Sequence, residues 1–341
     1  MFVQYSAAII PHLLSERPMR TPCLGVDNLV KTCARSRSQE IDSKSWGGSV
    51  PKSLQCRAFQ STDSLDTLQE EEFIMCGIVG AIALRNVTPI LLEGLNRLEY
   101  RGYDSAGLAV LDDAGQLQRA RAVGKVAALE QALEQQPLTG HLGIAHTRWA
   151  THGKPSQANA HPHLSEGLAV VHNGIIENHA QLRKQLIEAG YEFRSETDTE
   201  VIAHLLAFHY SRKPNLLCAF RATLSQLRGA YALGLIHQAE PDALYCARMG
   251  SPLVIGEASE EHFIASDPLA LLQVTDRFLY LEEGDHARLT LTTREVFDSR
   301  NQLRDLPVKR YEHAAHSLDK GGYRHYMLKE FTSSPPPSPI P

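Results

Sequence analysis

The sequence predicts an α+β fold with stacked sheets, and two observations favour it. Apolar runs of strand length and amphipathic helices follow one another without the regular strand–helix–strand alternation of a Rossmann-type sheet. The chain has 341 residues, of which 43% are hydrophobic and 21% charged, and this composition is typical of a globular protein. Such a length holds one large domain or two ordinary ones.

The expected strands are short apolar runs, several of which end at polar residues. The first leads directly away from Cys76. In chain order we expect strands at Gly77–Leu84, Gly107–Asp112, Leu142–Thr147, Leu168–Ile176, Tyr231–Ile236, Ala243–Ala247, Leu253–Ile255 and Phe278–Leu281.

The expected helices follow from apolar periodicity and from end residues. Thr88 is expected to cap a helix with Pro89 at its first position. Its apolar face comprises Ile90, Leu91, Leu95 and Leu98. A second helix is expected at Gln181–Ala189 and stops at Gly190, and a third at Asp198–Tyr210.

Composition excludes several classes of function. The net charge of −5 gives no sign of a nucleic-acid partner, and no run approaches the roughly 18 apolar residues of a membrane span. Six cysteines, at 23, 33, 56, 76, 218 and 246, form no CxxC pair and no regular spacing. We therefore expect reduced thiols in a cytoplasmic protein, with no metal and no cofactor.

Both ends of the chain differ from its middle. Up to Arg57 there are eight Lys/Arg against four Asp/Glu, with many serines and no sustained period. We expect residues 1–74 to be a leader or a misassigned upstream segment without a fixed fold. At the other end, residues 300–330 are expected to be a linker and residues 331–341 an aberrant Pro/Ser-rich tail, as in an interrupted chain.

Cys76 follows Met75, and a cysteine in that position can become an N-terminal residue. It then carries a thiol nucleophile and a free α-amine, which titrates near ~8 and can serve as the base. An internal Cys76 has only an amide nitrogen, which is not basic. The sequence therefore raises the question of whether the mature chain begins at Cys76.

Polar clusters behind this cysteine have the residue types of an acyl-transfer site. Arg148 suits a carboxylate and Asp198 an ammonium group, and the pair describes a site for a free amino acid. Asn173 and the Gly174 N–H suit an oxyanion.

Each residue also has an ordinary structural explanation. Cys76 is explained as a small core residue, Asn173-Gly174 as a turn, Arg148 as a surface ion pair and Asp198 as a helix N-cap. His161 and His163 lie near His146 and His152 in the sequence, but no carboxylate stands at metal-ligand spacing.

The chain from Met75 to about Glu330 resembles the glutaminase domain, a class II glutamine amidotransferase, of the glutamine–fructose-6-phosphate aminotransferases. Long segments carry the resemblance: MCGIVGAIA, LEYRGYDSAGLAV, GIAHTRWATHG, NAHPH, VVHNGIIENH, SETDTEVIAHL and YRHYMLKE. It implies the four-layer αββα sandwich of N-terminal nucleophile hydrolases and a glutaminase domain over residues 75–299.

The resemblance also implies roles for single residues. Cys76 is the nucleophile, and its freed α-amine is the base. Asn173 and Gly174 match the oxyanion hole. Arg148 and Asp198 match the holders of the α-carboxylate and the α-amine of glutamine. Thr151 and His152 line the same pocket, Trp149 lies on a loop that closes over the substrate, and Arg101 matches a position near the nucleophile.

The expected reaction converts glutamine to glutamate and ammonia through a thioester. Fructose 6-phosphate is bound in the family by sugar isomerase domains that this chain lacks, so it is a partner only through them. No oligomeric state is assigned, because dimerisation in the family depends largely on that missing half. Two alternatives stay open: a silent glutamine-binding module, if Cys76 is not N-terminal, and a thiol hydrolase that acts on another amide.

Overall fold

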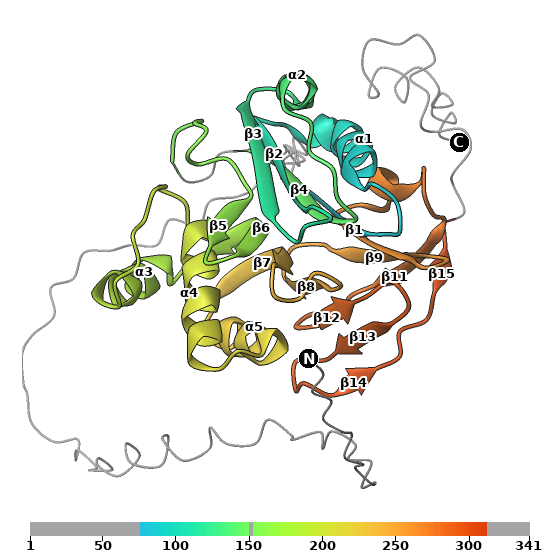
Figure 1. Cartoon of the computed structure of the whole chain (residues 1–341). Coiled ribbons are helices and arrows are strands. Elements are labelled where there is room, and N and C mark those ends of the chain that lie inside the picture. Colours follow the sequence, from blue (N-terminus) through green and yellow to red (C-terminus); the bar gives the residue numbers. More distant parts are fainter. Residues whose placement is uncertain (1–75, 150–152, 312–341) are drawn as a thin grey trace, which may run out of the picture. The chain divides into compact units, whose positions relative to one another are not determined.

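The computed structural model describes residues 76–149 and 153–311, except for the side chain of Arg101, and all of them lie in one unit. Two antiparallel sheets form its centre (Figure 1). The expected leader, the tail and residues 312–330 of the expected linker lie outside the described residues.

The larger sheet has eight strands in the order β15-β11-β9-β10-β1-β4-β2-β3. Its strands are β1 (Gly77–Ile82), β2 (Ser105–Leu111), β3 (Leu117–Val123), β4 (Leu142–Arg148), β9 (Val254–Ala258), β10 (Glu261–Ala265), β11 (Arg277–Tyr280) and β15 (Lys309–Arg310). β1 lies in its middle, paired with β4 on one side and β10 on the other.

The smaller sheet has seven strands in the order β14-β13-β12-β8-β7-β6-β5. They are β5 (His163–Ser165), β6 (Leu168–Ile176), β7 (Gly229–His237), β8 (Leu244–Met249), β12 (His286–Leu289), β13 (Arg294–Phe297) and β14 (Leu303–Arg304). β6 has the bounds that its apolar run predicts.

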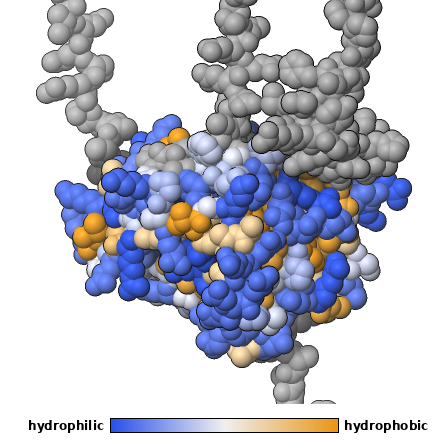
Figure 2. All heavy atoms as spheres, turned by 90° about the horizontal axis from the view of Figure 1, so that it is seen from above, coloured by the Kyte–Doolittle hydropathy of each residue, from blue (hydrophilic) through white to orange (hydrophobic). Residues whose placement is uncertain are grey.

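The helices cover the outer faces of the two sheets. They are α1 (Thr88–Leu98), α2 (Val126–Gln135), α3 (His179–Glu188), α4 (Thr199–Arg212) and α5 (Leu216–Leu224), with short 3₁₀ helices at Glu99–Arg101 and Pro268–Leu271. The face seen from above in Figure 1 is mainly hydrophilic where it is described, with small groups of apolar residues (Figure 2).

Three apolar clusters fill the spaces between the layers. One joins α1 and α2 to the larger sheet, one lies between the sheets, and one joins the smaller sheet to α3, α4 and α5. The layers are therefore helix, sheet, sheet and helix. The predicted α+β fold, a four-layer αββα sandwich, is confirmed.

Some local expectations were wrong. Val87, not Thr88, occupies the N-cap position of α1. The Thr88 hydroxyl donates instead to the Leu138 carbonyl, and the Asn86 side chain accepts from the Thr88 N–H. The expected linker also starts too early: β14 pairs with β13 and β15 with β11, so residues 300–311 continue both sheets.

Candidate active site

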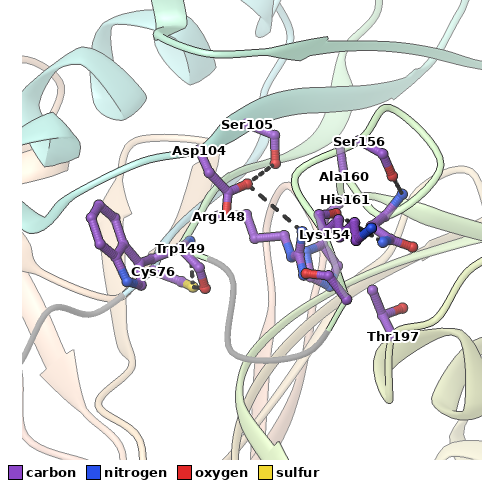
Figure 3. A network of polar contacts seen from close by, with 12 residues as sticks. Cys76, Asp104, Ser105, Arg148, Trp149, Lys154, Ser156, Ala160, His161 and Thr197 are labelled. Atoms are coloured by element: carbon purple, nitrogen blue, oxygen red, sulfur yellow. Dashed lines mark hydrogen bonds and ion pairs between the residues drawn. The ribbon is translucent and has the colours of Figure 1, made fainter.

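The candidate nucleophile stands at the start of the central strand β1. Gly77 lies opposite Thr147 in the β1–β4 register, so Cys76 lies beside the end of β4. The Trp149 N–H donates to the Cys76 sulfur at 3.1 Å (Figure 3). The register thus brings together two segments that are 73 residues apart in the chain.

The surroundings of the Cys76 thiol favour its neutral form. Burial raises the pKa of this thiol, and the Trp149 N–H and the Arg148 guanidinium only partly offset that effect. A thiol with a raised pKa is a weak nucleophile at neutral pH unless a base removes its proton. The arrangement therefore requires a base, and an N-terminal Cys76 would supply one in its own α-amine.

Asn173 reaches Cys76 from the second sheet. Its Nδ2 donates to the Cys76 backbone carbonyl at 2.8 Å. His146 Nε2 lies 2.9 Å from Asn173 Oδ1 and 3.0 Å from the His172 carbonyl oxygen. Both are acceptors, so Nε2 carries the proton, and burial lowers the pKa of His146 to about 3. A neutral His146 thus fixes the orientation of the Asn173 amide, whose Nδ2 points to the Cys76 carbonyl.

Gly174 follows Asn173 with a backbone that only glycine adopts readily. Its φ is +124°, and a Cβ there would lie 2.1 Å from the Ala230 carbonyl oxygen. The pair is not a turn, since both residues lie within β6 and pair with β7.

Arg148 ends β4 and its side chain is buried. Nη2 donates to the Gly153 carbonyl at 3.4 Å, and Nη1 lies 3.7 Å from Asp104 Oδ1 (Figure 3). The side chain is only 4% exposed, which argues against a surface ion pair. Asp104 also accepts a hydrogen bond from Ser105 Oγ, and its carboxylate positions the guanidinium. Asp104 lies in the LEYRGYDSAGLAV segment, but this role was not predicted from the sequence.

Asp198 stands at the N-cap position of α4, but its side chain caps nothing there. Its Oδ2 accepts from the Ile176 N–H at 2.8 Å, at the end of β6. The capping explanation is therefore wrong. This bond ties the start of α4 to the strand that carries Asn173 and Gly174.

Three histidine rings contact one another beside the site. The centroids of His146 and His161 are 4.2 Å apart with tilted rings, and those of His161 and His163 are 4.9 Å apart, edge to face. Burial lowers the pKa of all three, that of His163 to about 3. No group of His, Cys, Asp or Glu in the described part of the chain could hold a metal ion. The rings form a neutral layer behind Asn173.

Of the remaining predicted site residues, the structure describes Trp149 and the backbone of Arg101. Trp149 is 42% exposed and lies beside Cys76. Thr151 and His152 lie outside the described residues, and of Arg101 only the backbone, in the helix Glu99–Arg101, is described. The contact of His146 with Asn173 was not predicted from the sequence, although His146 lies in the GIAHTRWATHG segment.

The chain is similar to known glutamine amidotransferases. Residues 146–273 match the family model described as glutamine amidotransferase domain. The glutamine–fructose-6-phosphate aminotransferase [isomerizing] of Pseudomonas syringae pv. tomato is 58% identical over 266 residues, which are 76% of this chain and 43% of that protein. Its counterpart in Pseudomonas aeruginosa is 57% identical over 262 residues, with the same shares. The chain spans less than half the length of these relatives.

A solved structure is also similar. It is the glutamine phosphoribosylpyrophosphate amidotransferase of B. subtilis complexed with ADP and GMP. Its TM-score is 0.54 at 27% identity, and the match covers 70% of this chain and 50% of that one.

Proposed function

The chain carries a glutamine amidotransferase domain of the kind found in the glutamine–fructose-6-phosphate aminotransferases, and from this premise we propose that it hydrolyses glutamine to glutamate and ammonia. One observation carries the proposal. The Asn173 amide donates to the backbone carbonyl of Cys76, which holds this amide against the residue that carries the thiol.

The reaction proceeds through a thioester. The α-amine of an N-terminal Cys76 takes the thiol proton, and the sulfur attacks the side-chain amide carbon of glutamine. Asn173 Nδ2 and the Gly174 N–H then donate to the oxyanion. The carbon–nitrogen bond breaks, the amine returns the proton and ammonia leaves. The amine then takes a proton from a water molecule, whose oxygen attacks the thioester carbon. The carbon–sulfur bond breaks, the amine returns the proton to the Cys76 sulfur, and glutamate leaves.

Substrate selection in the proposal rests on opposite charges. The buried Arg148 guanidinium binds the α-carboxylate, and the Asp104 contact positions it. The Asp198 carboxylate binds the α-ammonium group through the oxygen that the Ile176 N–H does not occupy. Thr151, His152 and Arg101 complete the pocket, and Trp149 closes over it.

The use of the ammonia belongs to the same proposal. The relatives are named as aminotransferases that act with fructose 6-phosphate, and the chain spans 43% of their length. We assign the amination of fructose 6-phosphate to glucosamine 6-phosphate to isomerase domains outside this chain. We also assign a cytoplasmic location, since the six cysteines form no CxxC pair and no regular spacing. In the described residues, no helix is long and apolar enough to cross a membrane.

The deciding experiment compares the 341-residue chain with a chain whose first residue is Cys76. Glutamate and ammonia released from glutamine are measured, and intact mass verifies each N-terminus. Activity confined to the second chain supports the free amine as the base. Glutamine binding without turnover in both chains would instead favour the silent binding module.

A substrate with a blocked α-amine tests the alternative thiol hydrolase. We expect N-acetylglutamine to be a poor substrate, because an amide cannot make the ion pair with Asp198. Equal turnover of glutamine and N-acetylglutamine would contradict the assigned role of Asp198 and favour a hydrolase of other amides.

A further inference from the structure

A cavity of about 620 Å³ lies apart from the predicted site residues, none of which is among its described lining residues. It lies between the edge strands β3 and β5, the segment 190–194 and the first turns of α4. Its volume is that of a site for a small metabolite. Arg119, Arg121, Arg194, His163, His204 and Tyr191 are among the residues that line it.

Strand β3 turns two arginines toward this cavity. Ala120 and Ala122 pack on the helix side of the larger sheet, whereas Leu117 packs into the core between the sheets. Alternate residues share a face, so Arg119 and Arg121 lie on the face of Leu117. The inner face of a sandwich normally carries apolar side chains, and two arginines there need an explanation beyond folding.

The two guanidinium groups keep most of their donors available. Arg119 Nη1 donates to the Pro162 carbonyl at 3.1 Å, and Arg121 Nη1 donates to the Ala160 and Ala158 carbonyls at 2.9 and 3.1 Å. A guanidinium has five N–H donors. Within the described residues, neither group forms an ion pair with a carboxylate.

The positive charges also disfavour one another. Burial, with Arg121 and Arg194 nearby, lowers the pKa of Arg119 to about 10. The Glu200 carboxylate offsets part of the positive charge of Arg119. Its oxygens, however, already accept hydrogen bonds from the Arg194 N–H, the Ser195 N–H and Ser195 Oγ at 2.7–2.8 Å. Glu166 and Glu192, the other lining carboxylates, are exposed. A ligand that brought negative charge to the arginines would relieve this repulsion.

We propose that this cavity binds a small anionic metabolite, whose phosphate or carboxylate group lies between Arg119 and Arg121, with Arg194 closing the exposed side. Planar guanidinium forks match both oxyanions with paired hydrogen bonds. His163, His204 and Tyr191 offer polar contacts to the rest of the ligand. The proposal does not depend on glutamine hydrolysis, because its test measures binding alone.

The test titrates the whole chain with inorganic phosphate, and separately with malonate, at constant ionic strength, and follows the midpoint of thermal unfolding. We expect a saturable rise, since a ligand that binds only the folded state stabilises it. Arg119→Gln should weaken binding at least tenfold, because one charged fork is lost. Arg310→Gln is the matched control, since this arginine is 78% exposed and lies outside the cavity.

A second measurement on the unmodified chain covers the case in which Arg119→Gln fails to fold. Phosphate should protect Arg119 and Arg121 from phenylglyoxal, read by peptide mass spectrometry, while Arg310 reacts as before. Preference for phosphate or for malonate identifies the class of anion. Three results would overturn the proposal. They are equal anion binding by the two variants, reaction of all three arginines that is the same with and without the anions, and no saturable binding of either anion.

Discussion

The buried, adjoining rings of His146, His161 and His163 make the stability of the fold sensitive to mild acid. Burial lowers the pKa of all three rings, that of His146 and His163 to about 3. In the unfolded chain a histidine titrates near 6.5. Between these values the unfolded state binds protons that the folded state excludes. Stability therefore rises with pH in this window and is lost as pH falls below about 6.5.

The size of the effect follows from the three rings. Lowering the pH from 7.5 to 5.5 protonates each ring in the unfolded state only, which costs about 1.4 kcal/mol per ring, or about 4 kcal/mol in total. This is a large share of the roughly 5–15 kcal/mol that stabilises a typical domain. Burial lowers the pKa of His209, His237, His262 and His286 as well, so they act in the same direction.

The assay is reversible urea unfolding of the whole chain at pH 7.5 and 5.5, followed by far-UV circular dichroism. His163→Gln isolates the contribution of one ring, because glutamine can keep a hydrogen bond to Thr197 Oγ1, now 3.0 Å from His163 Nε2. The free energy of unfolding at pH 7.5 minus that at pH 5.5 should be smaller by about 1.4 kcal/mol in this variant than in the wild type. A wild-type difference below about 1.5 kcal/mol, or a His163→Gln difference equal to that of the wild type, would refute the reasoning.

Three further outcomes are expected for chains that begin at residue 76. Cys76→Ala should abolish glutamine hydrolysis but keep glutamine binding by calorimetry, since Arg148 and Asp198 are untouched; lost binding would make the cysteine structural. Asn173→Ala should lower kcat by roughly 10²–10³ if its amide stabilises the oxyanion, and a change in KM alone would argue against that role. Gly174→Ala should lower the free energy of unfolding in urea by roughly 2–4 kcal/mol, because φ is +124° and the new Cβ would lie 2.1 Å from the Ala230 carbonyl oxygen. An unchanged urea midpoint would show that β6 adjusts to the added methyl group.

Long apolar runs made much of the fold predictable. LAVVHNGII gives β6 its observed bounds, and LGIAHT gives β4 all but its last residue. In contrast, LQRARAV forms β3, for which the sequence analysis has no element. Its arginines and small alanines lack the strong apolar alternation of a half-buried strand. Short strands such as β14 and β15 depend on tertiary pairing, which local sequence does not specify.

The candidate site was predictable as a set of residues but not as a geometry. The residue types of Cys76, Arg148, Asn173 and Asp198 suit amide chemistry, and the resemblance links them. The contact between Asn173 and Cys76 spans 97 residues of sequence, and neither spacing nor periodicity indicates it. The roles of His146 and Asp104 could not be predicted for the same reason. His146 acts through Asn173 on β6, and Asp104 acts through Arg148 on β4.

The register of the central strand explains how the site is held so closely. Cys76 precedes Gly77, which lies opposite Thr147, and β4 continues to Arg148 at the same edge. A shift of one residue in this register would move Cys76 by roughly 3.3 Å along the strand and turn its side chain to the other face. The Trp149 N–H would then no longer reach the sulfur, and the Asn173 amide would no longer meet the Cys76 carbonyl. A Cβ on Gly77 would lie 2.6 Å from Thr147 Oγ1 and 2.9 Å from the Leu98 side chain, so this close approach also excludes larger residues next to Cys76. The glycine after the cysteine therefore lets β1 lie close to β4 and α1, and this places the thiol beside the Trp149 N–H.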